Sequence, residues 1–166
     1  MLASIARIFD PLGLVLPVVA KAKLFLKNLW QLGLGWDEPL NPELSEEWSK
    51  LSRDFSNLSK VEFDRSACRG DITLYVFCDS SKRMYGFSCY ARFSEGSEVK
   101  TNLLYAKSKC APNKGKSLPT LELLSVFLAM KCIPTLISGL RSTCRITDVI
   151  ICVDSQVALS WILTGK

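Results

Sequence analysis

Apolar residues in this 166-residue chain repeat with one spacing before about residue 56 and with another after residue 71. Between residues 18 and 30 they recur every three or four positions, which is the period of an amphipathic helix. From residue 72 onward, β-branched and aromatic residues run continuously or alternate with polar ones, which is typical of strands. The interval between is rich in Ser, Lys, Arg and Asp and has no sustained apolar pattern. We therefore expect a helical part, a linker and a larger part that contains a sheet.

The first part is predicted to be a helical connector over residues 1–57, followed by a linker over 58–71. One helix covers 18–30, and a second begins at Asn41, a residue type favoured as a helix N-cap, with a proline directly after it. We interpret the aromatic residues on these helices, Trp30 among them, as core packing, because helical spacing alone explains them.

The second part, residues 72–166, predicts an α/β fold. Its expected elements are strands over 72–78, 84–93 and 101–106, a helix from Pro119 to about Cys132, a strand over 149–153 and a helix over 156–163. The helix from Pro119 is apolar nearly all round, so we expect burial on most of its sides. The wholly apolar fourth strand indicates a parallel neighbour, and the helix before it is the crossover that such a connection requires. A mixed sheet follows, with a site expected at the carboxyl ends of its parallel strands.

Three carboxylates are the candidate catalytic and metal-binding residues. Asp79 and Asp154 follow the first and fourth strands, and would emerge at the same sheet edge if those strands are parallel neighbours. Glu122 lies in the first turn of the helix and is the only charge between Pro119 and Met130, so it needs a partner. Three adjacent carboxylates repel one another, and Mg²⁺ or Mn²⁺ is the hard cation that such oxygen ligands favour. Ions of this kind promote phosphodiester hydrolysis.

Each of these acidic residues also has an ordinary structural interpretation. Asp79 and Asp154 can each be a helix cap or a turn residue after a strand. Glu122 can be only a favourable charge near a helix N-terminus. The joint occurrence of all three in one predicted topology is what favours a metal site.

Basic residues suggest contacts with phosphates. The chain has 21 Lys and Arg against 16 Asp and Glu, a net charge of +5, which suits a polyanionic partner without requiring one. The loop before the predicted helix contains four candidates for nucleic-acid binding: Lys107, Lys109, Lys114 and Lys116. The alternative interpretation is a solvated loop.

The cysteines argue against a zinc module and for a reducing compartment. Seven cysteines are present with no CxxC pair and no histidine, which excludes the usual zinc motifs. Several lie inside apolar runs, as free buried cysteines do, so we expect an intracellular protein. The apolar stretch over 12–20 weakly imitates a secretory signal, but Pro17 interrupts it. No uninterrupted run of about 20 apolar residues is present, so we expect neither secretion nor a membrane partner.

Short motifs along almost the whole chain resemble the polyproteins of BEL/Pao-type retrotransposons, the Pao retrotransposon peptidase family region included. Those that resemble the ribonuclease H segment are 77–81 (FCDSS), 105–109 (YAKSK), 119–124 (PTLELL) and 153–155 (VDS). Those that look like the connector after the reverse transcriptase are 5–13 (IARIFDPLG) and 29–37 (LWQLGLGWD). The motifs are weak singly and specific in combination.

This resemblance implies a ribonuclease H-like mixed sheet preceded by a small helical connector. It implies that Asp79, Glu122 and Asp154 bind Mg²⁺ or Mn²⁺, and that the substrate is the RNA strand of an RNA:DNA hybrid. It also implies a parent polyprotein with reverse transcriptase, peptidase and integrase parts as neighbours. The expected location is then intracellular, either the cytoplasm, within a virus-like particle, or the nucleus.

One departure from the family pattern concerns the end of the chain. The family's fourth carboxylate belongs to a later element, whereas this sequence ends at Lys166, before that carboxylate, the last strand and the closing helix. We therefore expect a partial domain, truncated at its C-terminus, that is a weak or inactive enzyme alone.

Two rival functions remain open from the sequence. The first is a non-catalytic connector that binds nucleic acid without cutting it, for which phosphate contacts would suffice. The second is an aspartic-type endopeptidase, because Asp-Ser occurs after two apolar strands. That activity needs a glycine next, where this chain has Ser81 and Gln156.

Overall fold

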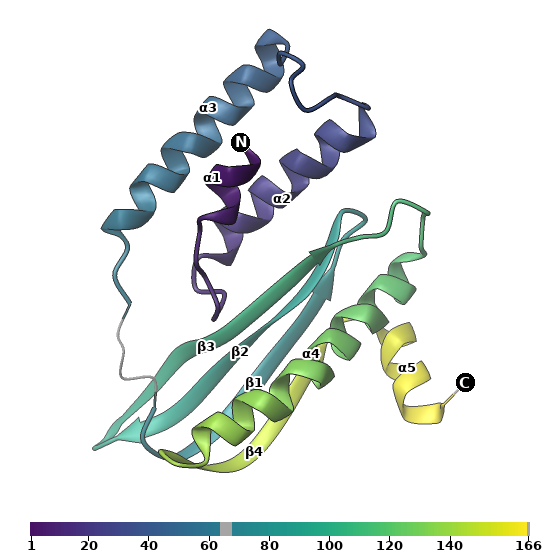
Figure 1. The fold of residues 1–166 in the computed structure, drawn as a ribbon. Helices are drawn as coiled ribbons and strands as arrows, with labels where there is room; N and C mark the ends of the chain where they lie inside the picture. Colours follow the sequence, from purple (N-terminus) through teal and green to yellow (C-terminus); the bar gives the residue numbers. More distant parts are fainter. Residues whose placement is uncertain (64–67, 166) are drawn as a thin grey trace. The chain divides into compact units, whose positions relative to one another are not determined.

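The computed structural model describes residues 1–63 and 68–165, and the chain divides into two compact units (Figure 1). Residues 64–67, which belong to the predicted linker, lie outside the described residues. The N-terminal unit consists of Met1–Pro11 and Val15–Phe63, and the C-terminal unit of Leu12–Leu14 and Asp64–Lys166.

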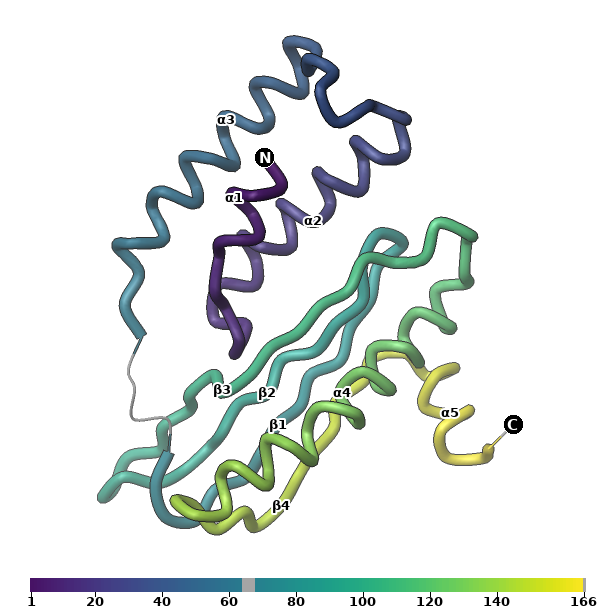
Figure 2. The backbone as a smooth tube through the Cα atoms, viewed as in Figure 1, coloured from purple at the N-terminus to yellow at the C-terminus, as the bar shows by residue number. Residues whose placement is uncertain are grey.

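The N-terminal unit is helical, as the apolar spacing predicts. Its helices are α1 (Leu2–Ala6), α2 (Leu16–Gln31), α3 (Pro42–Asn57) and the short 3₁₀ helix η1 (Leu58–Lys60). Figure 2 shows the course of the backbone through α1, α2 and α3. The Asn41 side chain accepts a hydrogen bond of 2.8 Å from the amide of Leu44, so α3 begins at the predicted cap. Phe25 and Leu29 of α2 pack with Leu44 and Leu51 of α3 to form its core.

The expected burial of Trp30 is wrong. Its side chain is 62% exposed, whereas Ala22, Phe25 and Leu29 of the same helix are buried. Successive helical residues differ by about 100° around the axis, which places Trp30 on the flank of that buried face. Trp48 of α3 does join the core, where it stacks on Phe25 with ring centroids 6.0 Å apart.

The C-terminal unit is a four-stranded mixed sheet with a long helix on one face (Figure 1). Its elements are β1 (Gly70–Ser80), β2 (Met84–Glu95), β3 (Glu98–Cys110), α4 (Leu118–Leu140), β4 (Cys144–Val153) and α5 (Gln156–Thr164). The strand order is β3-β2-β1-β4, in which β1 is antiparallel to β2 and parallel to β4. The predicted α/β mixed sheet and its parallel pair are therefore confirmed.

All four strands and helix α4 extend further than the sequence predicts, and β4 begins at Cys144 although its predicted start is residue 149. Strand β3 continues to Cys110, because Lys107 and Lys109 pair with β2 and lie in a strand instead of a loop. Helix α4 continues past Pro134 to Leu140. A proline inside a helix removes one backbone hydrogen bond, but Leu136, Ile137 and Leu140, which follow Pro134, pack against the sheet core, and this packing favours continuation.

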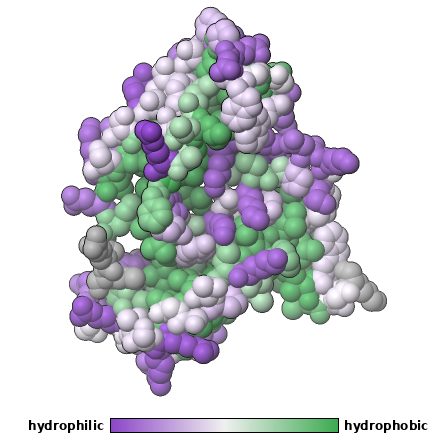
Figure 3. All heavy atoms as spheres, viewed as in Figure 1, coloured by the Kyte–Doolittle hydropathy of each residue, from purple (hydrophilic) through white to green (hydrophobic). Residues whose placement is uncertain are grey.

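The expected burial of α4 on most sides is also wrong. Its inner face, which includes Val126, Ala129 and Ile133, packs in the sheet core, whereas Phe127 and Met130 are each 55% exposed. Figure 3 shows apolar side chains at the surface along α4 and α5. By length and composition alone, α4 is also sufficient to cross a membrane. Packing in the sheet core explains the apolar character of the inner face of α4, but not that of its exposed residues.

Residues Leu12–Leu14 lie at the outer edge of β3, within the C-terminal unit. The amide of Ala106 donates a hydrogen bond of 2.8 Å to the carbonyl oxygen of Leu12. Gly13 has a φ of 75°, and a Cβ atom there would lie 1.9 Å from the carbonyl oxygen of Ala106. Only glycine combines this conformation with so close an approach, which gives a physical reason for the glycine in the motif 5–13.

Candidate metal centre

The parallel pairing of β1 and β4 brings two of the predicted carboxylates to one edge of the sheet. Asp79 is the next-to-last residue of β1, and Asp154 directly follows β4. The register pairs Cys78 with Val153, so each aspartate comes one residue after a paired position. Both are exposed. Both aspartates therefore lie at the carboxyl ends of the parallel strands, as the sequence predicts.

The third carboxylate comes from the helix that covers the sheet. Ser117 is the N-cap of α4, and its side chain accepts a hydrogen bond from the amide of Thr120. The sequence predicted Glu122 in the first turn of this helix. The helix begins at Leu118, so Glu122 lies in its second turn and that prediction is wrong. Glu122 is only 4% exposed, although it is charged at neutral pH in its ordinary state.

The three carboxylates meet at one point. One carboxylate oxygen from each of Asp79, Glu122 and Asp154 can be chosen so that all lie within 4.8 Å of one another. The elements that supply them are two strands and a helix from separate parts of the C-terminal unit. Oxygen-only donors at such separations suit a hard divalent cation such as Mg²⁺ or Mn²⁺ better than zinc.

Ser80 holds the buried carboxylate in place. Its hydroxyl donates a hydrogen bond of 2.7 Å to Oε1 of Glu122. The second oxygen, Oε2, is buried and has no hydrogen-bond partner among the described residues. A buried carboxylate oxygen without a partner is costly, so the site fits a group that would bind this oxygen.

Ser80 was not among the site residues predicted from the sequence, although strand alternation offered a signal. In β1, Val76 and Cys78 are buried in the core, and Ser80 follows at the same spacing of two. A polar side chain on the face that packs against an apolar helix requires a partner. Glu122, the acidic residue near the start of that helix, is the partner.

The electrostatics of the site favour a cation. Burial raises the pKa of Glu122 above its ordinary value, and the negative charges of Asp154 and Asp79 raise it further. The hydrogen bond from Ser80 acts in the opposite direction and lowers this pKa. The charged form of Glu122 is thus disfavoured until positive charge is placed nearby.

The four predicted lysines divide between a strand and a loop near this end of the sheet. Lys107 and Lys109 lie in β3, and Lys114 and Lys116 are exposed in the loop that leads to α4. Across the sheet, Ser80 pairs with Tyr85, and Tyr85 pairs with Lys109. Lys109 therefore lies at the sheet end that carries the carboxylates.

The turn between β1 and β2 adds basic residues that were not predicted from the sequence. Lys82 and Arg83 are exposed in this turn, where Ser81 separates them from Ser80. The carbonyl oxygen of Arg83 accepts a hydrogen bond of 2.8 Å from the amide of Ala111, which joins the turn to the start of the lysine-containing loop. Their signal was only their place between the first two predicted strands.

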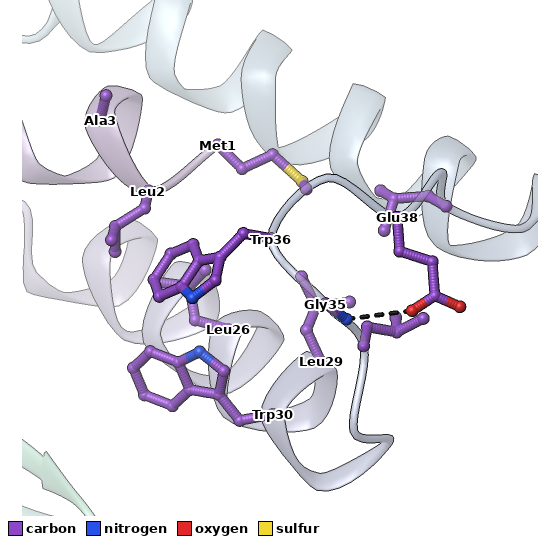
Figure 4. Close-up of a pocket in the computed structure, with 11 residues that line it drawn as sticks. Met1, Leu2, Ala3, Leu26, Leu29, Trp30, Gly35, Trp36 and Glu38 are labelled. Atoms are coloured by element: carbon purple, nitrogen blue, oxygen red, sulfur yellow. Dashed lines mark hydrogen bonds between the residues drawn. The ribbon is translucent and has the colours of Figure 1, made fainter.

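A pocket in the N-terminal unit has a different character (Figure 4). Its volume is about 350 Å³, and its lining is mostly apolar, with Trp30 and Trp36 among the lining residues. The amide of Gly35 donates a hydrogen bond of 3.0 Å to Glu38 at its wall. None of the predicted site residues lines this pocket. The carboxylate cluster is thus the candidate site.

Comparison with known proteins supplies a family for the chain. Among curated proteins, no match to this chain is found. A family model described as "Pao retrotransposon-like RNaseH-like domain" matches residues 1–155. The matched range contains Asp79, Glu122 and Asp154, the mixed sheet and the N-terminal helices. The chain therefore belongs to the family of Pao retrotransposon-like RNaseH-like domains.

Proposed function

We propose that Asp79, Glu122 and Asp154 bind Mg²⁺ or Mn²⁺, and that in the complete parent protein this centre hydrolyses the RNA strand of RNA:DNA hybrids. The observation that carries the proposal is the convergence of three carboxylates from separate elements within 4.8 Å. Family membership supports a nucleic-acid-related role, either hydrolysis or binding. The buried, unpartnered oxygen of Glu122 supports a bound cation in particular.

The structural alternatives explain Asp154 and Glu122 less well. The cap of α5 is Ser155, whose side chain accepts a hydrogen bond of 3.2 Å from the amide of Ala158, so Asp154 is not needed for that role. Glu122 lies in the second turn of α4, whereas the favourable effect of a negative charge is confined to the first turn of a helix. A peptidase dyad consists of two carboxylates that share a proton, whereas a third, buried carboxylate here favours a cation.

The side chains of this centre divide into metal ligands, a residue that orients one ligand, and basic residues for the phosphates. Asp79, Glu122 and Asp154 would hold the divalent cation, and Ser80 orients Glu122 through its hydrogen bond. A bound divalent cation supplies Lewis-acid stabilisation of phosphate oxygens and lowers the pKa of a water. The exposed basic residues at the same sheet end would bind phosphates of the hybrid on either side of the cleaved bond.

The test is cleavage of an end-labelled RNA:DNA hybrid in Mg²⁺ or Mn²⁺ by this chain and, in parallel, by the same chain extended to a complete domain. The proposal predicts cleavage of the RNA strand that is lost on chelation and in Asp79→Asn. Asp148→Asn, which changes an exposed aspartate elsewhere in the same sheet, should retain it. Hybrid binding that falls with salt, with no cleavage by either form of the chain, would overturn the nuclease proposal in favour of a non-catalytic binding module. Cleavage that survives in Asp79→Asn would equally contradict it.

A further inference from the structure

Two cysteines face each other at the end of β1 and β4 that is opposite to the carboxylates. The Sγ atoms of Cys68 and Cys144 are 2.9 Å apart, and each residue is only 7% exposed. Cys144 is the first residue of β4, and Cys68 precedes β1 by two residues. The proposed function uses neither of them.

Strand pairing and a side-chain hydrogen bond join the two backbone segments that carry these cysteines. Gly70, the first residue of β1, pairs with Cys144 in the parallel register, and its φ of 69° turns the chain where the strand begins. One residue further on, Arg145 donates a hydrogen bond of 2.8 Å from Nε to Asp71. The two thiols thus belong to segments that are already joined, although they are 76 residues apart in the chain.

The separation of the sulfur atoms is suited to a covalent bond. Bonded sulfurs lie about 2.0 Å apart, so the two atoms need to approach by only about 1 Å. The thiol of Cys144 also lies 3.3 Å from the carbonyl oxygen of Cys68, which directs the Cys144 side chain toward the Cys68 segment. The two thiols contact each other, and the pairing of β1 with β4 keeps them together.

We propose that Cys68 and Cys144 form a reversible disulfide by exchange with a low-molecular-weight disulfide such as glutathione disulfide. One cysteine thiolate attacks a sulfur of the small disulfide, whose S–S bond breaks and releases one small thiolate. The second cysteine thiolate attacks the protein sulfur of the mixed disulfide, forms the intramolecular S–S bond and releases the second small thiolate. Two protein thiols are oxidised, the small disulfide is reduced to two thiols, and the two thiol protons pass to the leaving groups.

The disulfide would stabilise the strand pair on which the carboxylate site depends. It joins the amino ends of β1 and β4, whose carboxyl ends carry Asp79 and Asp154. A crosslink between distant residues restricts the unfolded chain, and the effect grows with the length of the closed loop. Burial, together with the hydrogen bond to Cys144, raises the pKa of the Cys68 thiol, so the exchange is slow and requires long incubation.

The experiment maps disulfides in the native chain after incubation with glutathione disulfide. Free thiols are alkylated, the chain is digested without reduction, and linked peptides are identified by mass spectrometry. The expected product is one Cys68–Cys144 link that dithiothreitol reverses. It should be absent from Cys68→Ser and Cys144→Ser, and present in Cys110→Ser, which removes a half-buried thiol from β3.

A thermal unfolding measurement accompanies the mapping. The oxidised chain should unfold at least about 5 °C above the reduced chain, and the two serine variants should show no such rise. The two serine variants test the same bond independently, so poor folding of one leaves the other informative. Alkylation of both cysteines after oxidation, or separate glutathione adducts on them with no link, would overturn the proposal.

Discussion

Glu122 places a carboxylate in almost complete burial beside two other carboxylates, an arrangement that disfavours its charged form. One of its oxygens is satisfied by Ser80, and the other has no partner among the described residues. The three carboxylates of the site thus form a cluster of negative charge. A cation restores the balance, and its absence should be visible in the pH dependence of stability.

The first prediction concerns that pH dependence in the presence of a chelator. Because the folded-state pKa of Glu122 is raised above its ordinary value of 4.5, the folded chain binds more protons than the unfolded chain as the pH rises from that value through the raised pKa. Stability should therefore fall over this range. Glu122→Gln should be more stable than the unaltered chain above the raised pKa, and the difference should vanish at lower pH.

Thermal unfolding across the acid to neutral range measures this difference. Glu98→Gln, which neutralises an exposed glutamate at the start of β3, serves as the control and should leave the pH profile unchanged. Identical profiles for Glu122→Gln and the unaltered chain would show that burial of Glu122 does not disfavour its charge.

The second prediction concerns Ser80. Ser80→Ala removes the donor that orients Glu122, so affinity for Mn²⁺ should fall by about tenfold or more, as it does when the partners of metal ligands are removed. Isothermal titration with Mn²⁺ measures the change. Ser94→Ala, an exposed position near the end of β2, is the control. Unchanged affinity in Ser80→Ala would limit this serine to a structural role.

At the residue scale, the sequence predicted the carboxylates but not how they are held. Asp79 and Asp154 were predictable because each ends an apolar strand, and Glu122 because a lone charge in an apolar helix needs a partner. The bond from Ser80 joins residues 42 positions apart in the chain. Such an interaction depends on how helix and sheet pack, which local patterns do not specify.

At the scale of elements, β1 and β4 position the site and their pairing decides its geometry. The mixed sheet was predictable because a wholly apolar strand after a crossover helix indicates a parallel neighbour. The ends of β3 and α4 were not, because pairing with β2 extends the first and packing beyond Pro134 extends the second. Element types follow from local periodicity, whereas their ends depend on tertiary contacts.

The third prediction concerns the packing of β2 against β3 beside the site. Gly86 pairs with Asp79, and a Cβ atom at this glycine would lie 2.6 Å from the carbonyl oxygen of Lys107. Gly86→Ala should therefore lower the free energy of unfolding by about 1–3 kcal/mol. Urea denaturation measures the change.

A second glycine provides the matched control. Apart from its chain neighbours and the backbone of its own helix, a Cβ atom at Gly139 in α4 meets no described residue within 4 Å. Gly139→Ala should be neutral, or stabilise by up to about 1 kcal/mol, because alanine favours the helix. Equal effects of the two substitutions would contradict the close approach of β2 and β3 at Gly86.

At the scale of the whole molecule, the family match spans the helical N-terminal unit and the sheet-containing unit together. Residues Leu12–Leu14 belong to the sheet-containing unit, although helices of the other unit lie on both sides of them in the sequence. Periodicity separated a helical part from a sheet-containing part, but it did not indicate that a short early segment pairs with the edge of β3. A single backbone hydrogen bond to Ala106 has no periodic signature.

The fourth prediction concerns binding of the hybrid by the molecule as a whole. If Lys109 and Lys114 bind phosphates, replacing both with alanine should weaken binding and reduce the slope of log K against log salt by about one for each phosphate that is no longer bound. Fluorescence anisotropy at several salt concentrations measures the slope. Lys100→Ala is the control, because this lysine pairs with Glu95 at the opposite end of β3. A slope unaffected by the double substitution would exclude these lysines from the interface.

The most direct test of the carboxylate site is the binding of Mn²⁺ to the native chain, measured by titration calorimetry and by the shift in thermal unfolding. We expect saturable binding that raises the unfolding temperature, that is lost or strongly weakened in Asp79→Asn and Asp154→Asn, and that is retained in Asp148→Asn. Binding that persists unchanged in both site variants, or no binding to the unaltered chain, would contradict a metal centre formed by Asp79, Glu122 and Asp154.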